Sequence, residues 1–110
     1  MIKVTINRNE HNEITAFEMS GHADFAKRGQ DIVCAGASAV SFGTVNAIIA
    51  LCKITPEIEQ GGDGGYLRCT IPTNIDSSVF EKIQLLLEGM IVSLQTIERD
   101  YGKYIKIHIK

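Results

Sequence analysis

The chain has 110 residues, enough for one domain that buries a hydrophobic core without disulfides or metals. Hydrophobic residues make up 45% and charged residues 22% of the chain, a composition typical of a soluble globular protein. The formal net charge of −2 argues against direct binding of nucleic acid, because phosphate recognition requires a basic surface.

Nothing in the sequence indicates a membrane span or an export signal. The chain lacks the roughly 18 consecutive apolar residues of a transmembrane helix, and its first residues lack the apolar run of a signal peptide. An odd number of cysteines without such a signal fits reduced thiols in the cytoplasm. The spacing of Cys34, Cys52 and Cys69 forms neither a C-x-x-C pair nor a zinc-binding pattern, so we expect no metal and no cofactor.

The N-terminal segment predicts a β-hairpin. Apolar residues alternate with polar ones over residues 2–7, which is the pattern of a half-buried strand. Residues 9–12 are polar and form the expected turn, and residues 13–20 form the second strand. A loop over residues 21–30, which contains glycines and charged residues, leads to the next element.

A helix is expected from Asp31 to about Lys53. Asp31 is a typical N-cap residue, and it places Cys34 in the first helical turn. The body of this helix, residues 35–52, contains no Asp, Glu, Lys or Arg. Because a helix that is apolar on every side is normally buried on most sides, we expect it at the centre of the domain.

A second hairpin is expected after Pro56, which ends the first helix. Residues 57–60 and 66–71 are predicted strands, and the glycine-rich segment 61–65 between them is predicted to form a wide turn. This segment joins two strands and does not open a helix, so we interpret it as a turn rather than a phosphate-binding loop.

The remaining sequence predicts an amphipathic helix and a final strand. Apolar residues recur with a period close to 3.6 from Asp76 or Ser77 to Tyr101, and Gly102 is expected to end the helix. Three isoleucines of the last strand are expected to point into the core: Ile105, Ile107 and Ile109.

The resulting order, ββαββαβ, predicts an α+β fold that is a two-layer sandwich of about five mostly antiparallel strands with two helices. The whole chain, residues 1–110, is expected to form this single domain. We expect the first helix to lie between the sheet and either the second helix or a partner subunit.

One histidine and one cysteine form the candidate site. His22 follows the end of the second predicted strand, and Cys34 lies at the N-terminal end of the predicted helix, where unpaired N–H groups and the helix dipole favour a thiolate. The helix terminus alone contributes only about 0.3–1 kcal/mol. A nearby imidazole is therefore needed to ionise the thiol and to protonate a departing amine. We predict that His22 and Cys34 form the catalytic pair of a cysteine-dependent enzyme.

Three further residues are predicted to support this pair. Asp31 is favoured as a helix cap, with orientation of the histidine as the alternative role. Ser38 lies one helical turn after the thiol and either lines the site or is a small packing residue. Gly21 and Gly29 flank the loop and could act as its hinges, although glycines in turns also occur without such a role.

These residues resemble the signature of the Prp family of ribosomal-processing cysteine proteases. The matching segments are Gly21-His22-Ala23 and Asp31-Ile32-Val33-Cys34-Ala35-Gly36-Ala37-Ser38, and the order of elements extends the match over essentially the whole chain. The resemblance implies a cysteine endopeptidase with a His22–Cys34 dyad. It also implies that the substrate is the N-terminal extension of large-subunit ribosomal protein bL27, with an aromatic- and aliphatic-rich cleavage motif, and that the enzyme is a homodimer.

The mechanism expected of such a site is acyl transfer by the Cys34 thiolate, with His22 as proton donor to the leaving amine. Backbone N–H groups of Ala35 and Gly36 are candidates to stabilise the oxyanion. Two other functions are compatible with the sequence. One is a non-catalytic module that binds a ribosomal peptide in the same groove. The other is a thiol redox sensor, but Cys52 lies about 27 Å from Cys34 along the helix and is too distant to resolve it.

Overall fold

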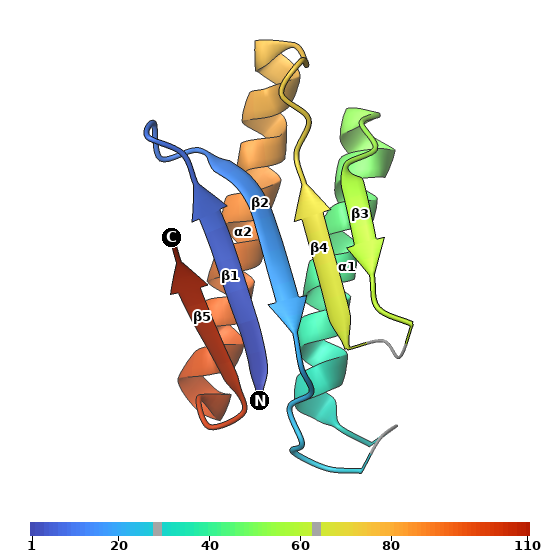
Figure 1. Ribbon diagram of the computed structural model, residues 1–110, viewed down its shortest axis with the longest axis vertical. Helices are drawn as coiled ribbons and strands as arrows, with labels where there is room; N and C mark the ends of the chain where they lie inside the picture. The colour runs from blue at the N-terminus through green and yellow to red at the C-terminus, as the bar shows by residue number, and fades with distance from the viewer. Residues whose placement is uncertain (28–29, 63–64) are drawn as a thin grey trace.

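The computed structural model describes residues 1–27, 30–62 and 65–110, which form a sheet and a helical layer (Figure 1). The strands of the described residues are β1 (Ile2–Arg8), β2 (Ile14–Ser20), β3 (Glu57–Gln60), β4 (Tyr66–Thr70) and β5 (Ile105–Ile109). The helices are α1 (Ile32–Cys52) and α2 (Ser77–Tyr101). The predicted order ββαββαβ and the α+β class are confirmed. The predicted hinge at Gly29 and the centre of the glycine-rich turn lie outside the described residues.

The sheet has the strand order β3-β4-β2-β1-β5. Strand β5 pairs in parallel with β1, and the other pairings are antiparallel, as expected for a mostly antiparallel sheet. The parallel pairing is possible because α2 carries the chain from the end of β4 back to the start of β5, so that β5 runs in the same direction as β1. Alternate strand residues point toward the helices and are buried there: Val4, Ile6, Phe17, Leu67 and Ile105. Ile109 was expected in this core but is 51% exposed, because it ends a strand at the edge of the sheet.

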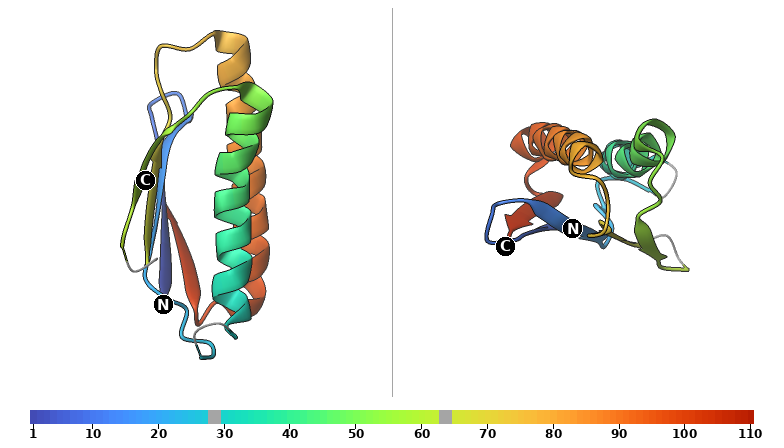
Figure 2. Two further views of the ribbon diagram at one scale, coloured as in Figure 1. Left: turned by 90° about the vertical axis from the view of Figure 1, so that its right-hand side faces the viewer. Right: turned by 90° about the horizontal axis from the view of Figure 1, so that it is seen from above.

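Both helices lie side by side on one face of the sheet and run in opposite directions (Figure 2). The expectation that α1 lies between the sheet and α2 is therefore wrong. A helix without charged residues has no distinct polar face, so the pattern could not show which side of α1 is buried. The two helices pack against each other around Gly36, where an added Cβ would lie in ordinary contact with Cδ1 of Ile97, at 3.6 Å. The other alternative, in which a partner subunit packs against α1, stays a prediction.

Much of α1 is exposed in the single chain, contrary to the expectation of a mostly buried central helix. Its buried residues form one stripe: Val33, Ala37, Ser41, Val45 and Ile48. Ile32 and Leu51 on other sides are 57% and 71% exposed. With 21 residues and a mean hydropathy of 1.8, α1 is long and apolar enough to cross a membrane. Length and composition alone are weak evidence for this, because core helices of soluble proteins meet the same criteria.

One end of the molecule brings together the segments that carry the predicted site. The N-terminal end of α1, the C-terminal end of β2, the start of β4 and the C-terminal end of α2 all lie at the lower end in Figure 1. Strand pairing fixes part of this arrangement, since Ser20 at the end of β2 pairs with Tyr66 at the start of β4. The His22 loop thus leaves the sheet directly beside the helix that carries Cys34.

Candidate active site

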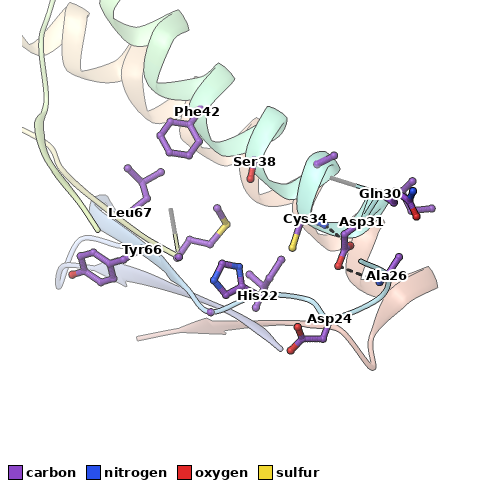
Figure 3. A pocket seen from close by; sticks show the side chains of 16 residues that line it. His22, Asp24, Ala26, Gln30, Asp31, Cys34, Ser38, Phe42, Tyr66 and Leu67 are labelled. Atoms are coloured by element: carbon purple, nitrogen blue, oxygen red, sulfur yellow. Dashed lines mark hydrogen bonds between the residues drawn. The ribbon is translucent and has the colours of Figure 1, made fainter. Parts of the chain in front are cut away.

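A cavity of about 630 Å³ lies between the N-terminal end of α1 and the adjoining ends of β2 and β4 (Figure 3). His22 and Cys34 both line it, and their side chains point into it from the β2–α1 loop and from α1. Four further predicted site residues line the same cavity: Gly21, Asp31, Ala35 and Ser38. Gly36 is instead turned toward α2, where Ile97 is its neighbour.

The sulfur of Cys34 accepts a hydrogen bond from the backbone N–H of Ala23, with an N···Sγ distance of 3.2 Å. Ala23 is buried, so little water competes for this donor. The contact places the sulfur, which lines the cavity, directly beside the backbone of Ala23. This donor could not be predicted from the sequence, because the contact depends on how the segment after β2 folds back onto the helix.

The carboxylate of Asp31 joins the β2–α1 loop to the helix. Its Oδ1 atom accepts hydrogen bonds from the N–H groups of Val33 and Cys34, each at 3.0 Å, which makes Asp31 the N-cap of α1. Its Oδ2 atom accepts from the N–H groups of Phe25 at 2.9 Å and Ala26 at 3.4 Å. Both oxygens are thus occupied by backbone donors, and no hydrogen bond links Asp31 to His22 within the described residues.

These backbone donors keep Asp31 ionised at neutral pH. Burial raises the pKa of its carboxyl group, but the N–H groups of Cys34, Phe25, Ala26 and Val33 together outweigh burial. The pKa of Asp31 therefore lies below its ordinary value. This is the behaviour expected of a carboxylate that accepts several backbone hydrogen bonds.

Three N–H groups at the start of α1 are already bound to Asp31, although the sequence suggested that they are available to the thiolate. Asp31 takes the N–H groups of Val33 and Cys34 through its side chain, and the N–H of Ala35 through its carbonyl oxygen at 3.0 Å. Ala35 was predicted as an oxyanion donor, but its N–H already serves the first helical hydrogen bond. The donor directed at the sulfur is the N–H of Ala23.

The His22 side chain is exposed at the cavity wall, and within the described residues it forms no hydrogen bond to Cys34. Its Cα is separated by two bonds from the nitrogen of Ala23 that contacts the sulfur. The backbone that carries the imidazole therefore lies close to the thiol, at the wall of the same cavity. Catalytic hydrogen bonds are often long before substrate binds, so this geometry is compatible with a Cys–His pair.

The cavity also has an apolar wall that was not predicted from the sequence. It is formed by residues from both layers: Ile2, Met19, Phe42 and Leu67. Figure 3 shows Phe42 and Leu67 on the side of the cavity away from Asp24. Such a wall beside two polar reactive groups is typical of a pocket that binds an apolar side chain of a ligand. The described residues contain no cluster of three or more His, Cys, Asp or Glu that could hold a metal ion.

Comparison with known sequences then identifies the family. The family model described as "Cysteine protease Prp" matches residues 1–106 of the chain. The chain belongs to the Prp family. The ribosomal processing cysteine protease Prp of Bacillus subtilis is 51% identical over 107 residues, which cover 97% of this chain and 96% of the relative. Its counterpart in Staphylococcus aureus is 46% identical over 111 residues and is matched along the full length of both chains.

Solved structures of a Prp protease have the same fold. The essential ribosomal processing protease Prp from S. aureus, in complex with a covalently linked product peptide, has a TM-score of 0.89 at 46% identity. The same protease in complex with a substrate peptide has a TM-score of 0.84 at 43% identity. Both comparisons cover 100% of each chain. The resemblance to the Prp family noted from the sequence is therefore confirmed.

The three cysteines of this Prp family member are expected to differ in reactivity. Cys69 is fully buried, and burial raises the pKa of its thiol to about 11, so it is neutral and shielded at neutral pH. Cys52 is half-buried at the far end of α1. Cys34 faces the cavity and its sulfur accepts the Ala23 N–H. Iodoacetamide should therefore label Cys34 first and Cys69 only after unfolding.

Peptide mass spectrometry of protein labelled with and without guanidinium measures this order directly. Labelling of Cys69 in the folded protein at the rate of Cys34 would contradict the burial of its thiol. A Cys34→Ser variant is the control, because it should leave the slow labelling of the other two cysteines unchanged.

Proposed function

We propose that this chain is a cysteine endopeptidase in which His22 and Cys34 form the catalytic dyad. The observation that carries the proposal is the hydrogen bond from the Ala23 N–H to the Cys34 sulfur, in a cavity that His22 also lines. A thiol that only packs in a core needs neither a backbone donor nor an adjoining cavity. Membership of a cysteine protease family supports the same assignment.

The proposed reaction is acyl transfer in two steps. The Cys34 thiolate attacks the scissile carbonyl carbon and forms an S–C bond, the C–N bond breaks, and His22 gives its proton to the departing amine. The acyl group is then bound to the enzyme as a thioester. Water, deprotonated by the now neutral His22, attacks this thioester and releases the carboxylic acid, which restores the Cys34 thiolate and the protonated His22.

The Ala23 N–H is the donor that we assign to the oxyanion of this reaction. When the sulfur bonds to the substrate carbon, the carbonyl oxygen lies next to that sulfur and within reach of a donor already 3.2 Å from it. The backbone of Ala23 is held in a buried position, so it needs no reorganisation during the reaction. The N–H of Ala35 would first have to give up its bond to the Asp31 carbonyl.

We propose that the substrate is the N-terminal extension of large-subunit ribosomal protein bL27. The apolar wall of Ile2, Met19, Phe42 and Leu67 supports a cleavage motif rich in aromatic and aliphatic side chains. The family relatives are named for ribosomal processing, and one of them has been solved with substrate and product peptides. Three free cysteines agree with a site of action in the cytoplasm.

We further propose that the enzyme is a homodimer. The helical layer exposes large apolar side chains that a second copy could bury: Ile32, Ile49, Leu51, Leu85 and Val92. Among these, Leu85 and Val92 lie two turns apart on the same side of α2. Sedimentation of the purified chain tests the proposal, and a mass equal to one chain at micromolar concentration would contradict it.

The function is tested with a synthetic peptide that spans the extension of bL27 and the first residues of the mature protein. We expect mass spectrometry to detect two products whose masses add up to the substrate plus one water. A peptide of the same composition in scrambled order is the control. Tight binding of the intact peptide without products would instead favour the non-catalytic binding module. Cleavage of both peptides at equal rates would contradict bL27 as the specific substrate.

A further inference from the structure

An aromatic contact holds the β2–α1 loop against the end of α2. The ring of Phe25 meets the ring of Tyr101 with a centroid distance of 5.6 Å and an interplanar angle of 84°. It meets the ring of Tyr104 at 5.1 Å and 80°. Both pairs have the edge-to-face geometry that aromatic rings prefer. One side chain of the loop is thus held by two rings that lie close together in sequence.

The two tyrosines form a fixed platform. The N–H of Tyr104 donates to the carbonyl oxygen of Tyr101 at 2.8 Å, and the carbonyl oxygen of Tyr104 accepts from the N–H of Ile2 at 2.9 Å. Glu98, one turn before Tyr101, accepts the N–H of Ile107 at 2.8 Å and so ties α2 to β5. The platform is therefore linked by hydrogen bonds to a helix and to two strands of the sheet.

The backbone on either side of Phe25 connects this platform to the reactive sulfur. The N–H of Phe25 itself donates to Oδ2 of Asp31, whose Oδ1 caps the helix that carries Cys34. Two residues earlier, the N–H of Ala23 donates to the Cys34 sulfur. The ring of Phe25 therefore anchors a short segment whose N–H groups donate to the helix-capping carboxylate of Asp31 and to the sulfur of Cys34.

Phe25 is not among the described residues that line the cavity, although its neighbours Asp24 and Ala26 are. Its side chain is 38% exposed, and it lies outside the cluster of buried core residues. A large apolar residue with this placement contributes little to the core and does not reach a ligand in the cavity. Its partners in the structure are the two tyrosine rings.

We propose that Phe25 is a positioning residue, which holds the Ala23 N–H on the Cys34 sulfur by docking the β2–α1 loop on Tyr101 and Tyr104. The consequence for activity rests on the proposed function of Cys34 as the nucleophile. Without the ring, the segment from His22 to Ala26 keeps only its backbone hydrogen bonds and samples positions in which the Ala23 N–H no longer meets the sulfur.

Hydrogen exchange measured by NMR in the absence of substrate tests the structural part. In Phe25→Ala, the Ala23 amide should exchange at least about tenfold faster, because local opening of the loop becomes easier. Amides of the core residues Val4 and Leu87 should keep their wild-type rates. Phe25→Tyr is the matched control, since it retains the ring and should retain slow exchange at Ala23. Phe25→Leu, which keeps apolar bulk without a ring, provides a second test if the alanine variant folds poorly.

Kinetics with a cleavable peptide tests the functional part. In Phe25→Ala we expect kcat to fall by about 10- to 100-fold, because a small misplacement of catalytic groups has effects of this size. KM should stay near the wild-type value, and Phe25→Tyr should restore kcat. A rise of KM with unchanged kcat would overturn the proposal and make Phe25 a substrate contact.

The exchange measurement keeps this proposal separate from the proposed function. Unchanged exchange at Ala23 in both Phe25→Ala and Phe25→Leu would overturn the proposal even if the enzyme cleaves its peptide. Equal acceleration of all amides would also overturn it, because Phe25 would then act on global stability. Faster exchange at Ala23 alone would support the positioning role even if the bL27 peptide proved to be the wrong substrate.

Discussion

Replacement of Cys34 by alanine is expected to lower peptide cleavage by about 10⁴-fold or more, since removal of a catalytic nucleophile leaves only binding and oxyanion stabilisation. The fold should persist, because Cys34 is half-buried and its side chain faces a cavity. Cys34→Ser is expected to be inactive as well. The serine hydroxyl can accept the Ala23 N–H, but it does not ionise near neutral pH. Cleavage is measured by mass spectrometry and the fold by circular dichroism.

Substitution of His22 and a matched control at Cys52 test whether the loss of activity is specific to the Cys–His pair. His22→Ala should lower the rate by about 10²- to 10⁴-fold, the range for general acid–base catalysis. The double variant should be no slower than Cys34→Ala, because residues that act as one unit are not additive. Cys52→Ala is the control, since Cys52 lies at the other end of α1 and should be dispensable. Wild-type cleavage by Cys34→Ala would exclude the proposed mechanism.

Periodicity in the sequence predicted α2 better than α1. Most apolar residues of α2 lie on one stripe, with Leu85 and Val92 outside it, so both the length of the helix and its buried face followed from the pattern. The residues of α1 are apolar or small on all sides, so the pattern predicted the helix but not its orientation. Its position beside α2 depends on packing between segments that are distant in the sequence, such as those around Gly36 and Ile97.

The same distinction between local and distant contacts applies to the site. The role of Asp31 as N-cap could be predicted because it involves backbone N–H groups only two and three positions along the chain, those of Val33 and Cys34. The N–H of Ala23 lies 11 positions from the sulfur that accepts it, and the loop between them has no periodic pattern. The contact of Phe25 with Tyr101 spans most of the chain, so it could be known only from the folded structure.

Gly21→Ala is expected to destabilise the protein and to disturb the site at once. Gly21 has a φ of +89°, a conformation that costs a residue with a side chain about 1–3 kcal/mol. An added Cβ would also clash with the carbonyl oxygen of Met1. That carbonyl cannot easily move away, because the next residue, Ile2, donates its N–H to Tyr104 and pairs with β5. We expect a fall in melting temperature of roughly 5–20 °C.

The loss of activity should exceed what this loss of stability explains. Gly21 precedes His22 directly, and its N–H donates to the carbonyl oxygen of Gly65 at 2.9 Å, so any shift of its backbone also moves the imidazole and the Ala23 N–H. At a temperature where the variant is fully folded, kcat/KM should still be lower by about 100-fold. Gly43→Ala is the matched control. It lies in α1 with open space around it and should be stabilised by about 0.5–1 kcal/mol. Wild-type turnover by folded Gly21→Ala would show that the position of His22 does not depend on the conformation of this glycine.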